Sequence, residues 1–443
     1  MSEAISEALW NLITTTGHTL QQVPGLAVVV RYIQRSYQND PIRVIIEVLV
    51  FIWALQSDLN VTLTTGERLQ NWATANYLGL QNNADITQAA IETVRQYGVG
   101  ACGPAGFYGS MDVHLDLEKQ LAQILGTEEA IVYSQGFMAV ASVIPAFCKR
   151  SDIIVADSGV SFAGQTGLEI SRSQVYFFEH NDMEDLERVL KQVDQDCLRK
   201  KMPLSRRFIV AEGLYAKHGD KCPLPKIIEL KERYKYRLML DESLSFGCIG
   251  PRGLGISDYF GIPATKIDII AGSFSQALGS SGGFCAGSHH VVDHQRLSSQ
   301  AYCFSAALPP LLAVATSLAL QQVESCPEVI HDLRRNMTVF NAVLETSLPK
   351  RFVVNGDRDS PLRFVRLSTR HEDPEHEVSV MNVIVKEMRK RGFLVTRDKH
   401  VQSREKFIPP PSVKVCLSSG FSEKETNTFA NALIESMRVA RVV

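Results

Sequence analysis

Short apolar runs alternate with amphipathic ones in the middle of the chain. The amphipathic runs MEDLERVLKQV and PKIIELKERYK repeat their apolar positions every three or four residues, as helices do. Strands that alternate with helices predict an α/β fold with a mostly parallel sheet, whose ligands bind beyond the carboxyl ends of the strands. The strand-like runs, several of them apolar on both faces, read EAIVYSQG, DIIVADS, QVYFFEH, RRFIVAEG, YRLMLDES and IDIIAGS.

The pattern changes towards the carboxyl end. From about residue 327 the chain is more charged and its strand-like runs, FVRLS and VKVCLS, are fewer and looser. We therefore expect a large domain over residues 61–326 and a smaller α+β domain over residues 327–443.

The amino-terminal segment, residues 1–60, contains a different kind of apolar run. Residues 44–55 are apolar except for Glu47. A bilayer-spanning helix needs about 20 apolar residues, and a carboxylate in lipid is costly. From the residues alone, a membrane-associated helix over residues 41–56 and a buried helix are equally good interpretations.

Composition narrows the functional classes. The 443 residues carry a formal net charge of −2 and no long Lys/Arg run, which argues against a nucleic-acid-binding protein. The nine cysteines are scattered without CxxC spacing, so neither a zinc ribbon nor a disulfide framework is indicated. Single cysteines of this kind are typical of a reducing compartment.

Two motifs have plain interpretations. GVGACGPAGFYG contains GxGxxG at Gly98, Gly100 and Gly103, but it follows a helical pattern instead of a strand, so it predicts a surface or interface loop and not a dinucleotide site. The second motif, SHHVVDHQR, has no Glu or Cys nearby to complete a ligand set, and we predict no metal there. Its candidate ligands are His289, His290, Asp293 and His294.

Three other features point to one kind of site. Asp241 ends a buried strand, where a carboxylate either caps the next helix or faces a ligand. SQGF, from Ser134, opens a helix with hydroxyl and glycine residues, which favours phosphate. The loop from Asp268 to Gly287 is built almost wholly of small residues. Together they predict a pyridoxal phosphate (PLP) site without its lysine, because Gln276 stands at the centre of that loop.

The motifs resemble those of a known family. Over residues 70–440 the chain is similar to the α-oxoamine synthases, which are fold-type I, aspartate-aminotransferase-like PLP enzymes. Among them it most resembles the group of lysine-less long-chain-base subunits of serine palmitoyltransferases. The motifs that carry the resemblance are NYLGL, YGVGACGPAGFYGSMDVHLDLE, YSQGF, EGLY, DESLSFG, SFSQALGSSGGF, DHQRLSSQAYCFSAALPPLL and PPPSVKV.

The resemblance implies a degenerate cofactor pocket with no catalytic residue of its own. Gln276 stands where the family's catalysts carry the lysine that binds PLP, and an amide nitrogen is not a nucleophile. Leu244 and Ser161 stand where those catalysts carry histidines. The resemblance leaves a vestigial cofactor pocket made of Asp241, Ser134, Gln135 and Gly136.

The resemblance also implies a heterodimer with a second, lysine-bearing serine palmitoyltransferase subunit, which would hold PLP covalently. Ser305 and Ala306 would approach the partner's cofactor phosphate, and Cys102 and Gly103 would line the shared cavity. Ala105 departs from the pattern, because related subunits carry an arginine there. The linker before NYLGL is also shorter than expected.

The implied reaction joins L-serine to palmitoyl-CoA, with loss of carbon dioxide, to give 3-ketodihydrosphingosine. The resemblance places the complex in the endoplasmic reticulum membrane, with its catalytic domains facing the cytosol and with small regulatory membrane subunits. One alternative is a pure scaffold that lends no residue to the chemistry. Another is a self-sufficient synthase, which the absence of lysine between Ile267 and Gly287 opposes.

Overall fold

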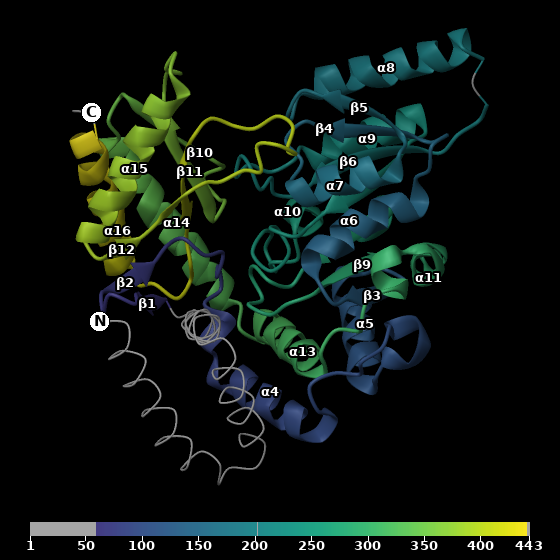
Figure 1. Cartoon of the computed structure of the whole chain (residues 1–443), viewed down its shortest axis with the longest axis horizontal. Helices are drawn as coiled ribbons and strands as arrows, with labels where there is room; N and C mark the ends of the chain where they lie inside the picture. Colours follow the sequence, from purple (N-terminus) through teal and green to yellow (C-terminus); the bar gives the residue numbers. More distant parts are fainter. Residues whose placement is uncertain (1–58, 202, 441–443) are drawn as a thin grey trace, which may run out of the picture. The chain divides into compact units, whose positions relative to one another are not determined.

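A seven-stranded sheet forms the centre of the larger part of the fold (Figure 1). The computed structural model describes residues 59–201 and 203–440. The strand order is β3-β9-β8-β7-β6-β4-β5, and five neighbouring strands, β8, β7, β6, β4 and β5, run parallel. The strands are β3 (Glu129–Tyr133), β4 (Ile153–Asp157), β5 (Gln174–Phe178), β6 (Arg207–Glu212), β7 (Arg237–Asp241), β8 (Ile269–Ser273) and β9 (Gly283–Gly287).

The predicted mostly parallel sheet is confirmed, with one addition. Strand β9 was not predicted, and it pairs antiparallel with both β3 and β8. Its sequence, GFCAG, has no β-branched residue, although all five of its residues are buried. A period-based pattern cannot identify such a strand, because the strand is short and its two end residues are glycines.

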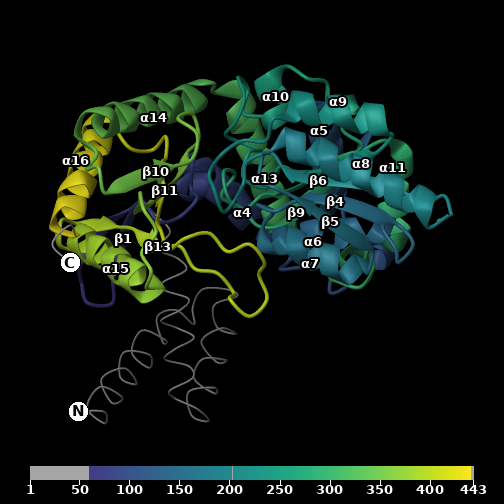
Figure 2. The same ribbon diagram turned by 90° about the horizontal axis from the view of Figure 1, so that it is seen from above.

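Helices cover both faces of this sheet. In Figure 2, α6 (Gly136–Phe147) and α7 (Phe162–Ser171) lie on one face, and α8 (Met183–Arg199) and α9 (Leu224–Tyr234) lie on the other. Helix α6 is apolar nearly all round and is buried, whereas α8 buries one stripe of leucine and valine. The other helices of this part are α4 (Ala84–Tyr97), α5 (Asp112–Leu125), α10 (Ile256–Phe260), α11 (His289–Ser298), α12 (Gln300–Cys303) and α13 (Pro310–Ser325).

The carboxyl-terminal part has a sheet of its own, with strand order β10-β11-β14-β13. All of its pairings are antiparallel. Its strands are β10 (Phe352–Asn355), β11 (Leu362–Leu367), β13 (Thr396–Arg397) and β14 (Val413–Cys416), and its helices are α14 (Glu328–Ser347), α15 (Pro374–Lys390) and α16 (Glu423–Val439).

An aromatic stack ties the early part of the chain to this carboxyl-terminal part. Strand β2 (Arg68–Asn71) pairs in parallel with β12 (Phe393–Leu394). The next residue, Trp72, is fully buried between Phe421 and Phe429, with ring centroids 4.1 and 3.9 Å away. Stacked aromatic side chains bury a large apolar area, so this contact fixes both segments in the core.

The amino-terminal segment is described only in part. Residues up to Arg68 form a separate unit, in which the structure describes β1 (Asn60–Thr62) and the turn after it. The predicted helix over residues 41–56 lies outside the described residues. Within residues 59–201 and 203–440, no helix has the length and apolar character needed to cross a membrane. The domain boundaries expected at residues 61 and 327 stay a prediction.

Candidate functional site: a degenerate cofactor pocket

A cavity of about 450 Å³ opens at the carboxyl ends of β6, β7 and β8. This is the edge of the sheet at which the sequence predicts a ligand site. The cavity brings together five residues singled out from the sequence, namely Gly136, Ser161, Asp241, Leu244 and Gln276. Ala75, Tyr77, Glu212, Leu362 and Lys414 also line it.

The floor of the cavity depends on a close approach of two backbones. Helix α6 begins at Gly136, directly after β3 and Gln135. A Cβ atom at Gly136 would overlap the hydroxyl of Ser273, at the end of β8. Only glycine allows the amino end of α6 to lie this close to β8, which explains the residue type at this position.

The loop after β8 satisfies its own polar groups. The Ser273 and Ser275 hydroxyls lie 2.8 Å apart, and the Ser275 hydroxyl donates to Gln276 Oε1 over 3.0 Å. The Ser275 backbone N–H donates to Ser273 Oγ over 3.2 Å. Covalent attachment of PLP needs a lysine amine at the position that the Gln276 amide occupies. The residues present do not fit covalently held PLP.

Ser161 also lines the cavity, as the amino-terminal cap of α7. Its hydroxyl accepts from the Gly164 N–H over 3.3 Å, and its own N–H donates to Glu212 Oε1 over 2.5 Å. Leu244 contributes an apolar side chain to the lining. Neither residue can exchange a proton near neutral pH, so these positions offer no general acid or base.

Ser134 and Ser305 meet in this structure. Their hydroxyls lie 3.1 Å apart, although 171 positions separate the residues in sequence. The predicted role of Ser305 towards a partner's cofactor therefore stays a prediction.

The glycine-rich loop pairs with the segment after α12. Pro104 and Ala306 form an antiparallel bridge, and the Ala307 N–H donates to the Gly103 carbonyl over 2.9 Å. A Cβ atom at Gly103 would overlap the Tyr108 ring. Cys102 beside it is exposed, with φ of 52°. The two segments expected at a shared interface thus lie side by side, and the loop follows helix α4, as predicted.

The acidic end of the cavity is its main electrostatic feature. Glu212 and Asp241 end the neighbouring strands β6 and β7 in register. Burial raises the pKa of Asp241 to about 6. Burial, and next the charge of Asp241, raise the pKa of Glu212 to about 8. Near neutral pH, one proton is therefore shared by a pair that would otherwise be doubly charged.

Two charged lining residues, Glu212 and Lys414, were not predicted from the sequence. Glu212 ends an apolar strand just as Asp241 does, so the same rule would have identified it. Lys414 comes from β14 of the other sheet and is half-buried. Its presence in the cavity follows from tertiary packing, for which the sequence gives no local signal.

The histidine cluster has structural partners. The backbone N–H of His289 donates to Glu128, and its ring contacts Glu129 over 2.6 Å. The His294 ring contacts the Ala146 carbonyl over 2.9 Å. Among the residues that the structure describes, no group of three or more His, Cys, Asp or Glu side chains is arranged to hold a metal ion.

Comparison with known proteins decides the family. The model for aminotransferase class I and II matches residues 67–433. "Long chain base biosynthesis protein 1b" of Oryza sativa subsp. japonica is 42% identical, over 82% of this chain and 75% of its own. "Serine palmitoyltransferase 1" of Dictyostelium discoideum is 41% identical, over 83% of this chain and 77% of its own. The chain belongs to the class I and II aminotransferase family, in its serine palmitoyltransferase 1 branch.

Solved structures agree on the fold. A Sphingomonas wittichii serine palmitoyltransferase matches 88% of this chain and 92% of its own, with a TM-score of 0.77 and 21% identity. A serine palmitoyltransferase from S. paucimobilis, with a bound PLP–myriocin aldimine, also matches with a TM-score of 0.77 and 21% identity. The match covers 88% of this chain and 93% of that one. The fold of the serine palmitoyltransferase 1 branch is therefore that of PLP-dependent enzymes of fold-type I.

The raised pKa values of Asp241 and Glu212 make the stability of the fold depend on pH. Both pKa values lie above those of the unfolded chain, so the pair stabilises the fold at low pH. That stability is lost as the pH rises through the folded values of about 6 and about 8. We expect the free energy of unfolding, measured by urea denaturation, to fall by about 1–3 kcal/mol across this interval.

Asp241→Asn tests whether the Glu212–Asp241 pair causes this pH dependence of stability. Without the Asp241 charge, the pKa of Glu212 falls, so the variant should lose less stability over the same pH interval. Glu372→Gln, at an exposed carboxylate, is the control and should follow the wild type. Equal pH slopes in all three proteins would show that the pair does not share a proton.

Proposed function

We propose that this chain is a subunit of a serine palmitoyltransferase that holds no cofactor itself and completes the active site of a lysine-bearing partner. One observation carries the proposal. A cavity lies at the carboxyl ends of the strands where the fold binds its cofactor, but an amide, Gln276, stands where the covalent bond to PLP would form.

The complex would condense L-serine with palmitoyl-CoA to 3-ketodihydrosphingosine, the first step of sphingolipid biosynthesis. PLP, bound by the partner, supplies an electron sink for the amino-acid carbanion. This chain would contribute walls of the shared cavity and stability to the partner. The family membership and the relatives' names support this assignment.

An exposed apolar surface supports association with a partner. Its residues come from two segments that the Pro104–Ala306 bridge joins, the glycine-rich loop and the end of α12. Val99, Phe107, Tyr108 and Phe304 are 74–83% exposed. A concentration of large apolar side chains on a surface marks an interaction site, because leaving them in water is unfavourable.

The proposal includes a location for the chain at a membrane. The apolar run over residues 41–56 would hold the chain at the endoplasmic reticulum membrane, with the catalytic domains on the cytosolic side. Small regulatory membrane subunits would bind the same complex. The lipid nature of the acyl donor and of the product supports this placement, because a membrane-bound complex meets both where they dissolve.

Co-expression tests the function. We expect condensation of serine with palmitoyl-CoA from the pair of this chain and a lysine-bearing partner, and none from this chain purified alone. If the chain lends residues to the shared site, Ser305→Ala should lower the turnover of the pair without reducing its assembly. Unchanged turnover and substrate choice would favour the scaffold alternative, and turnover by this chain alone would refute the proposal.

Phe107→Asp tests the interface. A charge in the centre of the exposed apolar surface should reduce the amount of partner that copurifies by roughly ten-fold or more, because a carboxylate resists burial. Leu198→Asp is the matched control, because Leu198 is 80% exposed but lies at the end of α8. Equal recovery of partner from both variants would show that this surface is not the interface.

A further inference from the structure

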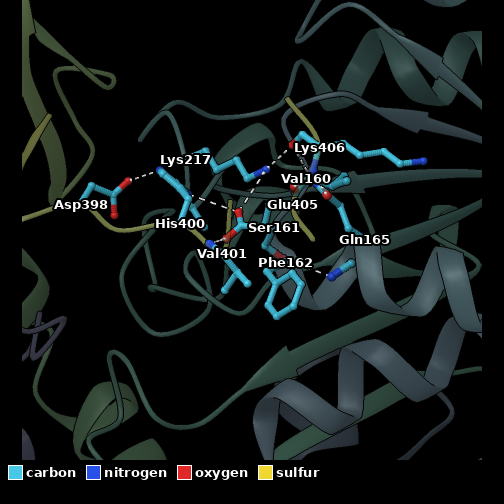
Figure 3. Close-up of polar contacts among 12 residues, drawn as sticks. Val160, Ser161, Phe162, Gln165, Lys217, Asp398, His400, Val401, Glu405 and Lys406 are labelled. Atoms are coloured by element: carbon cyan, nitrogen blue, oxygen red, sulfur yellow. Dashed lines mark hydrogen bonds and ion pairs between the residues drawn. The ribbon is translucent and has the colours of Figure 1, made fainter. Parts of the chain in front are cut away.

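A buried lysine fastens a long loop of the carboxyl-terminal part to the rim of the cavity. The loop is residues 398–408, which we call the strap; Figures 1 and 2 show it extending from the small sheet towards α7 and β5. The Lys217 side chain is 3% exposed. Its Nζ donates to the Lys406 carbonyl over 3.0 Å and lies 3.5 Å from the Glu405 carboxylate (Figure 3). A buried ammonium is tolerated only with such partners.

A histidine closes the strap upon itself. The His400 ring lies 2.9 Å from the Asp398 carboxylate and 3.2 Å from that of Glu405 (Figure 3). The other oxygen of Glu405 accepts from the Val401 N–H over 2.7 Å. The Glu405 carboxylate is therefore shared between His400 and Lys217, and the Asp398 carboxylate pairs with His400.

Gln165 binds the backbone of the strap through its side-chain amide. The Lys406 N–H donates to Gln165 Oε1 over 2.8 Å, and Gln165 Nε2 donates to the Lys406 carbonyl over 3.1 Å. The same nitrogen donates to the Val160 carbonyl over 3.1 Å. One amide of α7 thus binds the strap and the start of the cavity wall together, as the close-up shows (Figure 3).

The strap contacts lie directly behind the lining of the cavity. Ser161, Phe162 and Ala163 line it just before Gln165, and Ala216 lines it just before Lys217. A second cavity, of about 580 Å³, lies between α7, β5 and the strap, and Phe162 lines both. Movement of the strap would therefore change the wall that the two cavities share.

We propose that the strap is a latch over the Val160–Gln165 rim, and that Lys217 is the positioning residue that holds it shut. Opening the latch would release the rim and join the two cavities along Phe162. The inference rests on the contacts within this chain and does not depend on the proposed function.

The two cations of the latch have pKa values shifted in opposite directions. Burial lowers the pKa of Lys217, which interacts with the charges of Glu405, Glu212, Asp398 and His218. The hydrogen bond to Asp398 raises the pKa of His400. The charge on His400 therefore stabilises the closed strap and is lost as the pH rises through that raised pKa. The lowered pKa of Lys217 acts in the opposite sense, because the closed strap binds that proton less tightly than an opened one would, so the pH dependences of the two groups oppose each other.

Hydrogen exchange of the full chain, followed by mass spectrometry, tests the latch. Lys217→Met should reduce the protection factors of residues 401–406 and 160–165 together, by about ten-fold or more, and leave α16 unchanged. Lys399→Met, at an exposed lysine of the same strap, should leave both segments protected.

Two results would overturn the proposal. One is unchanged protection of the strap in Lys217→Met. The other is loss of protection spread equally over α16, which would mean that Lys217 supports the fold and not the latch. If Lys217→Met fails to fold, Gln165→Ala replaces it with the same expectation.

Discussion

The amide of Gln276 is the constraint on which the account depends. At the end of β8, it accepts from the Ser275 hydroxyl and completes a chain of hydrogen bonds that begins at Ser273. An amide is uncharged at every accessible pH and does not attack an aldehyde. The loop that would present a lysine to PLP is therefore satisfied by its own side chains.

The pocket keeps its shape because packing, and not catalysis, holds it. Gly136 brings α6 against β8, and a Cβ atom at Gly272 would overlap the Phe284 ring. These contacts belong to the core of the seven-stranded sheet and persist whatever residue occupies position 276. The acidic pair at the ends of β6 and β7 is present as well, and it keeps a proton because burial raises the pKa of both carboxyls.

The sequence predicted the features that follow from local chemistry. Six strands, the start of α6 at the phosphate-type loop and the convergence of Asp241 with Gln276 followed from apolar runs and from the rule that ligands lie at carboxyl strand ends. Strand β9 did not, because a short run of small residues has no period. Lys414 and Lys217 were not identified either, since their positions depend on segments separated by more than 150 residues.

The most direct measurement is the attachment of PLP to this chain. The purified chain would be incubated with PLP and reduced with borohydride, and its peptides would be mapped by mass spectrometry. Lys414 is the one lysine among the described residues that line the cavity. The account predicts no stoichiometric pyridoxyl adduct on any residue of this cavity. A stoichiometric adduct on Lys414 would contradict it, because the chain would then hold the cofactor without a partner.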